Sequence, residues 1–109
     1  MKAILINAKD RTIELVENNG DLSSMYDAIG CDMVEIGHFD TSNGDTLWVD
    51  EEGLLKDPQF GFVLYDKQFA GNGIIYGSNI GGDNISVRST IDSIIEHLLF
   101  FRVEAEASI

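Results

Sequence analysis

Hydrophobic and polar residues alternate with a strand-like period over most of this chain. Residues 2–7 form a short apolar run typical of a central strand. In residues 12–17 the alternation places Ile13 and Leu15 on one face, so the two segments and the turn between them predict a hairpin. The same reasoning predicts further strands over residues 33–39, 46–49, 60–65 and 73–76. These segments together predict an antiparallel or mixed sheet.

Two segments instead show the spacing of an amphipathic helix. In the first, Asp21 is a predicted N-cap, apolar residues follow at positions 22, 25, 26 and 29, and Gly30 ends the helix. The second is predicted over residues 90–101, capped by Thr90, with apolar residues at positions 91, 94, 95, 98 and 99. Strands combined with these helices predict an α+β fold: one domain over residues 1–109, with both helices packed on one face of the sheet. Phe100 and Phe101 then either seal the core or form a homodimer contact.

The turns between these elements are marked by glycine and polar residues. Asn43-Gly44 is the strongest turn signal, because both residues tolerate positive φ. A turn over residues 50–53 follows the strand at 46–49, and residues 81–83 are expected to form a loop.

Charge then narrows the range of functions. Nineteen acidic residues face seven basic ones in 109 residues, a formal net charge of −12. Binding to nucleic acid needs clustered Lys and Arg, so we expect no direct binding to DNA or RNA. An acidic chain is attracted to basic surfaces, including the nucleic-acid grooves of other proteins, although acidic surfaces also serve solubility alone. The densest acidic run, Asp50-Glu51-Glu52, is the predicted partner-binding site.

Length and composition are those of a single soluble domain. Hydrophobic residues make up 44% of the chain, enough for one core, and no apolar run approaches the ~20 residues of a membrane span. The N-terminal apolar run is too short for a signal peptide. The single cysteine, Cys31, has no partner for an internal disulfide. We therefore expect a cytoplasmic location, with no membrane association.

Candidate catalytic and metal-binding residues are few. His38, His97 and Cys31 do not have the spacing of a zinc motif, and a buried, unreactive role is expected for Cys31. No nucleophile motif and no desolvated carboxylate pair is indicated, so the chain is predicted not to be an enzyme and to need no metal or cofactor. The glycines at 71, 73 and 77 are expected to make a turn and a bulge, or else a loop that approaches a ligand.

Several segments together resemble a known family. They are the opening Met1-Lys2-Ala3-Ile4-Leu5-Ile6, the helix ending in Tyr26-Asp27-Ala28-Ile29-Gly30-Cys31, the segment Met33-Val34-Glu35-Ile36, the strand and turn Leu47-Trp48-Val49-Asp50-Glu51-Glu52-Gly53-Leu54-Leu55, and Phe69-Ala70-Gly71-Asn72-Gly73-Ile74-Ile75-Tyr76-Gly77. Over residues 1–78 the chain resembles the domain of unknown function 3846 family of phages, plasmids and other bacterial mobile elements. It departs from that family's pattern at Lys56-Asp57-Pro58-Gln59, and the segment from Thr90 lies outside the resemblance.

The resemblance implies an accessory role, with no catalytic residues to carry over. Together with the charge, it leads to the hypothesis of a non-enzymatic anti-defence protein, an anti-CRISPR or antirestriction inhibitor in a bacterial host cell. Its partner would be a host protein with a basic surface, such as a defence nuclease. The alternative is a small ligand-binding module, such as a sponge for a nucleotide signal, based on the glycine-rich stretch beside Tyr76 and Arg88. A small enzyme ranks last.

Overall fold

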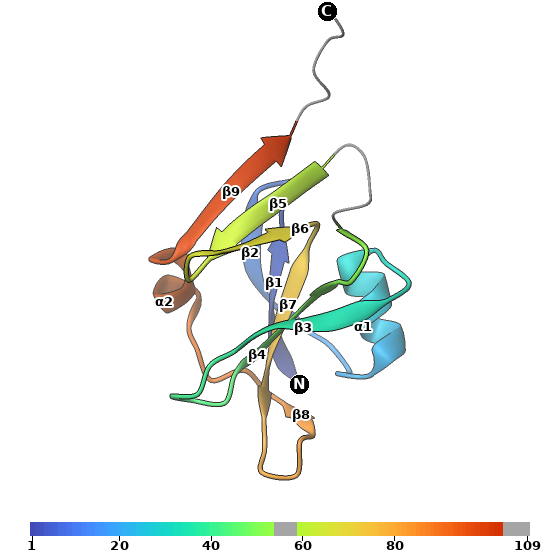
Figure 1. Ribbon diagram of the computed structural model, residues 1–109. Helices are drawn as coiled ribbons and strands as arrows, with labels where there is room; N and C mark the ends of the chain where they lie inside the picture. The colour runs from blue at the N-terminus through green and yellow to red at the C-terminus, as the bar shows by residue number, and fades with distance from the viewer. Residues whose placement is uncertain (54–58, 104–109) are drawn as a thin grey trace, which may run out of the picture.

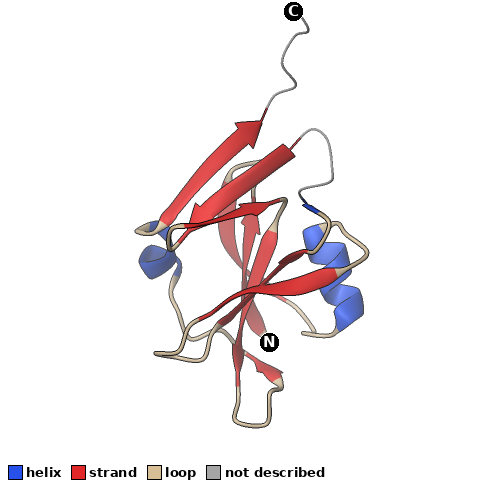
Figure 2. Cartoon of the chain, viewed as in Figure 1, coloured by secondary structure: helices blue, strands red, loops and turns tan. Residues whose placement is uncertain are grey.

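The strands predicted from the alternation are present in the computed structural model, which describes residues 1–53 and 59–103, and they divide between two sheets (Figure 1). In chain order the elements are β1 (Lys2–Asn7), β2 (Thr12–Glu17), α1 (Leu22–Ile29), β3 (Val34–Phe39), β4 (Thr46–Asp50), β5 (Gln59–Leu64), β6 (Lys67–Ala70), β7 (Gly73–Ser78), β8 (Asn84–Ile85), α2 (Ile91–Ile95) and β9 (Leu98–Val103). Figure 2 shows how far strands outweigh helix in the fold.

Every strand pairing is antiparallel. The larger sheet has the order β2-β1-β7-β4-β3, with β8 paired to one end of β7, and the smaller sheet has the order β6-β5-β9. The predicted α+β class with an antiparallel sheet is therefore confirmed. The strand β6 was not predicted, because the turn between β5 and β6 is made by Tyr65 and Asp66, which take positive φ without the glycine that marks such a turn in a sequence.

Both faces of the larger sheet are covered, which explains why its central strands read as continuous apolar runs. On one face, α1 packs Met25 and Ile29 against Ala3, Ile74 and Tyr76. On the other face, the smaller sheet and α2 pack against the larger sheet, and the residues buried there are Ile4, Ile6, Ala8, Leu47, Val49, Phe62, Leu64, Ile75 and Ile94. The two helices thus lie on opposite faces, and the expectation that they share one face is wrong in this detail.

Helix α1 has the predicted ends. The Asp21 carboxylate accepts a hydrogen bond from the Ser24 backbone N–H at 2.9 Å, which satisfies one of the free donors of the first turn. Gly30 adopts φ +80° and donates its N–H to the Tyr26 carbonyl at 2.8 Å, a left-handed cap that glycine favours.

The predicted helix over residues 90–101 is wrong beyond its first turn. Thr90 caps α2 as expected, with a reciprocal hydrogen bond to Ser93, but the helix ends at Ile95 and the chain continues as β9, paired with β5. Ile94, Leu98 and Phe100 reach the core, whereas Ile95 and Leu99 are 50% and 70% exposed. Residues 98–101 are all apolar, but only Leu98 and Phe100 face the core, which is the period of two of a strand. Pairing with β5 satisfies the backbone groups of this segment.

Candidate functional site

The predicted partner-binding residues lie where β4 leaves the larger sheet. The pairing of β3 with β4 places Asp50 opposite Val34, and the Glu51 N–H donates to the Met33 carbonyl at 3.0 Å. Glu35, Asp50 and Glu51 line one small cleft of about 70 Å³ against β6. We call Glu35, Asp50, Glu51 and Glu52 the acidic corner. The structure adds Glu35 to the sequence prediction, because only strand pairing brings β3 beside the turn.

The three predicted acids have two different roles. Asp50 is only 8% exposed, because it is still part of β4, and its Oδ1 accepts the Glu52 N–H at 2.9 Å. The sequence analysis placed Asp50 in the turn over residues 50–53, whereas the structure places it at the end of β4, where its side chain shapes the turn. Glu51 and Glu52 are exposed and present their charge to solvent.

The negative charge of the surface is little neutralised by the chain's own cations. Where both partners lie in the ranges 1–53 and 59–103, the ion pairs are those of Glu17, which contacts the N-terminal ammonium at 3.3 Å and Lys2 Nζ at 2.5 Å. Most of the other carboxylates described are exposed and have no cationic partner. Unscreened by local pairing, they give the molecule a negative field that reaches roughly one Debye length, about 8 Å at physiological salt.

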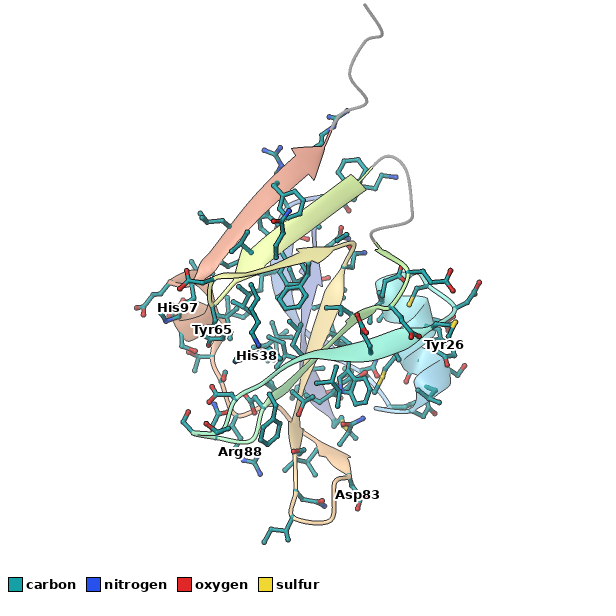
Figure 3. All side chains as sticks on the ribbon, viewed as in Figure 1. Tyr26, His38, Tyr65, Asp83, Arg88 and His97 are labelled. Carbon is teal, nitrogen blue, oxygen red and sulfur yellow. The ribbon has the colours of Figure 1, made fainter. Side chains whose placement is uncertain are left out.

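A second cluster joins the only two histidines of the chain. His38 from β3, Tyr65 from the β5–β6 turn and His97 from the α2–β9 connection lie ring against ring, with centroids 5.1 Å and 4.8 Å apart (Figure 3). The sequence analysis considered the histidines only as zinc ligands and did not predict this grouping. No local sequence pattern predicts this grouping, because the three residues come from separate parts of the chain.

The surroundings of this cluster are acidic. Burial, followed by the nearby charges of Asp40 and Asp45, raises the pKa of the Tyr65 phenol. The hydroxyl and the backbone N–H of Ser42 donate to Asp40 at 2.6 and 2.9 Å and hold the pKa of that carboxyl below its ordinary value of 3.8. Among the described residues, His38 Nδ1 is buried and has no hydrogen-bond partner.

The His–Tyr–His cluster has little free space on its buried side, whereas on its outer side Tyr65 and His97 line an open groove of about 600 Å³ together with Asp66 and Glu96. The cavity beside His38, Asp40 and Tyr65 has a volume of about 10 Å³, no more than one water molecule requires. Within the described part of the chain, no group of three or more His, Cys, Asp or Glu side chains is placed to hold a metal ion. The contact between Tyr65 and His38 connects the β5–β6 turn of the smaller sheet with β3 of the larger sheet.

Buried Asp45, which the sequence analysis did not single out, fixes the loop that leads into α2. Its two carboxylate oxygens accept the backbone N–H groups of Arg88 at 3.0 Å and Ser89 at 2.7 Å. Arg88 in turn donates its Nη1 to the carbonyls of Asn43 and Ser78, at 2.9 and 3.0 Å. These charge-assisted bonds tie the β3–β4 turn to the 86–90 segment.

The glycine-rich stretch belongs to the interior of the larger sheet. Gly73 and Gly77 are buried in β7, where a Cβ on Gly73 would lie 2.8 Å from the Phe62 ring and one on Gly77 would collide with the Ser86 carbonyl. The Tyr76 hydroxyl donates to Asn18 Oδ1 at 2.5 Å. The residues that suggested a nucleotide site therefore contact other parts of the fold.

Cys31 is buried, as expected.

The molecule is thus a small acidic α+β domain, and at the predicted partner-binding turn Glu51 and Glu52 present exposed carboxylates. A family model described as Domain of unknown function (DUF3846) matches residues 1–99, and the chain belongs to this family. The match extends past the resemblance over residues 1–78 and includes α2 and the start of β9. The departure at Lys56-Asp57-Pro58-Gln59 falls mainly on residues 54–58, outside the described residues. Comparisons with curated proteins and with solved structures gave no match.

No helix among the described residues is long and apolar enough to cross a membrane.

Proposed function

We propose that this protein is a non-enzymatic binding protein whose acidic corner engages a basic surface on another protein. The observation that carries the proposal is the exposed, unpaired charge of Glu51 and Glu52 beside Glu35, on a chain of net charge −12. Asp50 holds the turn that presents the two glutamates, so they project from a defined backbone. Preorganised charge lowers the entropy that binding costs.

The partner we propose is a host defence nuclease in the cytoplasm of a bacterial cell, and the role is that of an anti-CRISPR or antirestriction inhibitor. Its groove is lined with Lys and Arg for phosphate contacts, and carboxylates satisfy the same donors. The resemblance to proteins of mobile elements supports this setting, since such elements encounter host nucleases. Repulsion from phosphate keeps the inhibitor itself off duplex DNA.

The test begins with a pull-down from bacterial lysate, followed by kinetics with the purified partner. Glu51→Gln/Glu52→Gln removes two exposed charges from the acidic corner, and Glu14→Gln/Glu96→Gln removes two exposed charges elsewhere. We expect the corner variant to lower the association rate and the affinity more than the control, and added salt to slow association of the wild type. Nucleic acid that the partner binds should compete with the wild type.

Three results would count against this function. Equal kinetics for the two variants would remove the acidic corner from the mechanism. Salt-independent association would leave the net charge as a feature of solubility. Binding of the purified chain to duplex DNA at physiological salt would contradict the electrostatic argument.

The alternative of a small ligand-binding module rests on a different place from the glycine-rich stretch. An open, largely apolar groove of about 380 Å³ runs between β2 and residues 86–92 and includes Lys2, Leu15 and Ile91. Its volume is in the range of small-molecule sites, and Lys2 supplies one cation for an anionic ligand. A thermal-shift screen with nucleotides tests this alternative, with Leu15→Lys as the variant that should abolish any shift.

A further inference from the structure

Strand β9 forms an outer edge of the smaller sheet, and its second edge pairs with no strand among the described residues (Figure 1). An unpaired edge offers a row of backbone N–H and C=O groups to any strand that can approach it. Proteins guard such edges with charges, bulges, proline or short length.

The other sheet edges carry these guards. Strand β2 has Glu14 and Glu17, and β3 has Glu35 together with a bulge between Ile36 and His38. Strand β6 is four residues long and begins with Lys67. Strand β9 has six residues, Leu-Leu-Phe-Phe-Arg-Val, with neither proline nor acid and with no break in its pairing with β5.

The outer face beside this edge is apolar as well. Leu99, 70% exposed, lies opposite Val63 on that face. The half-exposed Ile95, four residues earlier in the chain, lines the same open groove as Leu99. The ring of Phe101 covers Gly61, where a Cβ would collide with it. The inner residues Leu98 and Phe100 are already packed on the core, so only the outer face and the backbone edge are available.

We propose that β9 is a homodimer interface, in which two copies of the chain pair antiparallel across a two-fold axis and join their smaller sheets. Directly opposed residues in an antiparallel pair point to the same face, so outer residues must meet outer residues. A two-fold axis at Phe100 satisfies this and places Leu99 of each copy opposite Phe101 of the other. The exposed Leu99 of each copy is then buried against the partly buried Phe101 of the other, and the contact occurs twice.

The charge distribution favours a second copy as the occupant. The basic partner of the proposed function would find no carboxylate within β9, since Arg102 is its only charged residue. Two copies, each of net charge −12, repel one another. Asp66 and Glu96 line the groove beside Leu99, but β9 itself carries no acid, so pairing along this strand adds the least repulsion. The dimer should therefore tighten as salt is added, the opposite of the response expected at the acidic corner. This difference separates failure of one proposal from failure of the other.

The oligomeric state of the full chain tests the proposal, by sedimentation velocity from micromolar to millimolar concentration. Leu99→Lys adds one guarding charge at β9, and Leu15→Lys, at a 51% exposed leucine of edge strand β2, is the matched control. We expect the wild type and Leu15→Lys to dimerise equally. Leu99→Lys should raise the dissociation constant about a hundredfold, because symmetry places it in the interface twice at about tenfold each. At a protein concentration low enough for all three to be monomeric, they should have the same melting temperature.

A wild type that stays monomeric throughout this concentration range would overturn the proposal, and the occupant of the β9 edge would then have to be a different protein. Unchanged dimerisation of Leu99→Lys would overturn it too, by placing the interface elsewhere. Cysteine cross-linking tests the register. Leu99→Cys mixed with Phe101→Cys should form an inter-chain disulfide faster than either variant alone. The reason is that the Cβ atoms of directly opposed residues, 99 and 101, are about 5 Å apart, whereas those of diagonal residues, such as 99 and 99, are about 7–8 Å apart. Faster cross-linking of Leu99→Cys with itself would contradict the axis at Phe100.

Discussion

Truncation of two adjacent isoleucines distinguishes the observed α2–β9 arrangement from a continuous helix. Ile94 is 2% exposed and packs in the core between the two sheets, whereas Ile95 is 50% exposed on the outer surface. In a helix continuing to Phe101, both residues would belong to one buried stripe, so their alanine variants would lose similar stability. In the observed fold the two losses must differ.

The expected magnitudes follow from these burial values. Ile94→Ala removes buried carbons from a packed core and should cost about 3 kcal/mol, within the 2–5 kcal/mol typical of such truncations. Ile95→Ala loses about half of the hydrophobic contribution and regains a few tenths of a kcal/mol in helix propensity, for a net cost of about 0.5 kcal/mol. At about 4 °C per kcal/mol, the melting temperature should fall by about 12 °C and about 2 °C, respectively.

Urea unfolding followed by the fluorescence of Trp48 measures both losses. The dependence on urea should stay the same in the two variants, so that the shift in midpoint reports stability alone. Leu98→Ala and Leu99→Ala form a second pair with the same logic, because Leu98 packs on the core and Leu99 is exposed. Equal losses within each pair would refute the strand and restore the helix.

Three further predictions concern the buried polar groups and pH. Asp45→Asn removes the charge that accepts two backbone N–H groups and should cost about 2–4 kcal/mol in urea unfolding, whereas the exposed control Asp32→Asn should cost less than about 0.5 kcal/mol. Burial raises the pKa of Tyr76 from 10.0 to about 12, so the contribution of Tyr76 to the free energy of unfolding should be complete below pH 10 and should fall as the pH rises towards 12. Relative to its own stability at pH 7, Tyr76→Phe should lose less stability than the wild type over this range. The pKa of Asp40 is lowered from its ordinary value of 3.8, so this carboxyl stabilises the fold above pH 3.8, and that stability is lost as the pH falls below this value. Asp40→Asn should therefore make stability depend less steeply on pH in the acid range. An unchanged dependence would show that Asp40 does not contribute to acid unfolding.

Local signals in the sequence were enough for the elements whose ends depend on their own residues. The caps at Asp21 and Gly30 predicted α1, because the side chain and the positive φ that end a helix are properties of those residues. The strands β1, β2, β4 and β7 followed from apolar runs and alternation, and the α+β class followed from them. Net charge, likewise, is a property of composition alone.

Only the tertiary structure decided which residues meet. Residues 91–99 fit a helical stripe locally, and β9 formed instead because β5 offered an edge and the core accepted Phe100 opposite Phe62. The burial of Asp50, the addition of Glu35 to the acidic corner and the stacking of His38 on Tyr65 all arise from strand pairing. Such contacts join residues far apart along the chain, and no local pattern encodes them, because their free energy comes from surfaces that exist only after the sheets have packed.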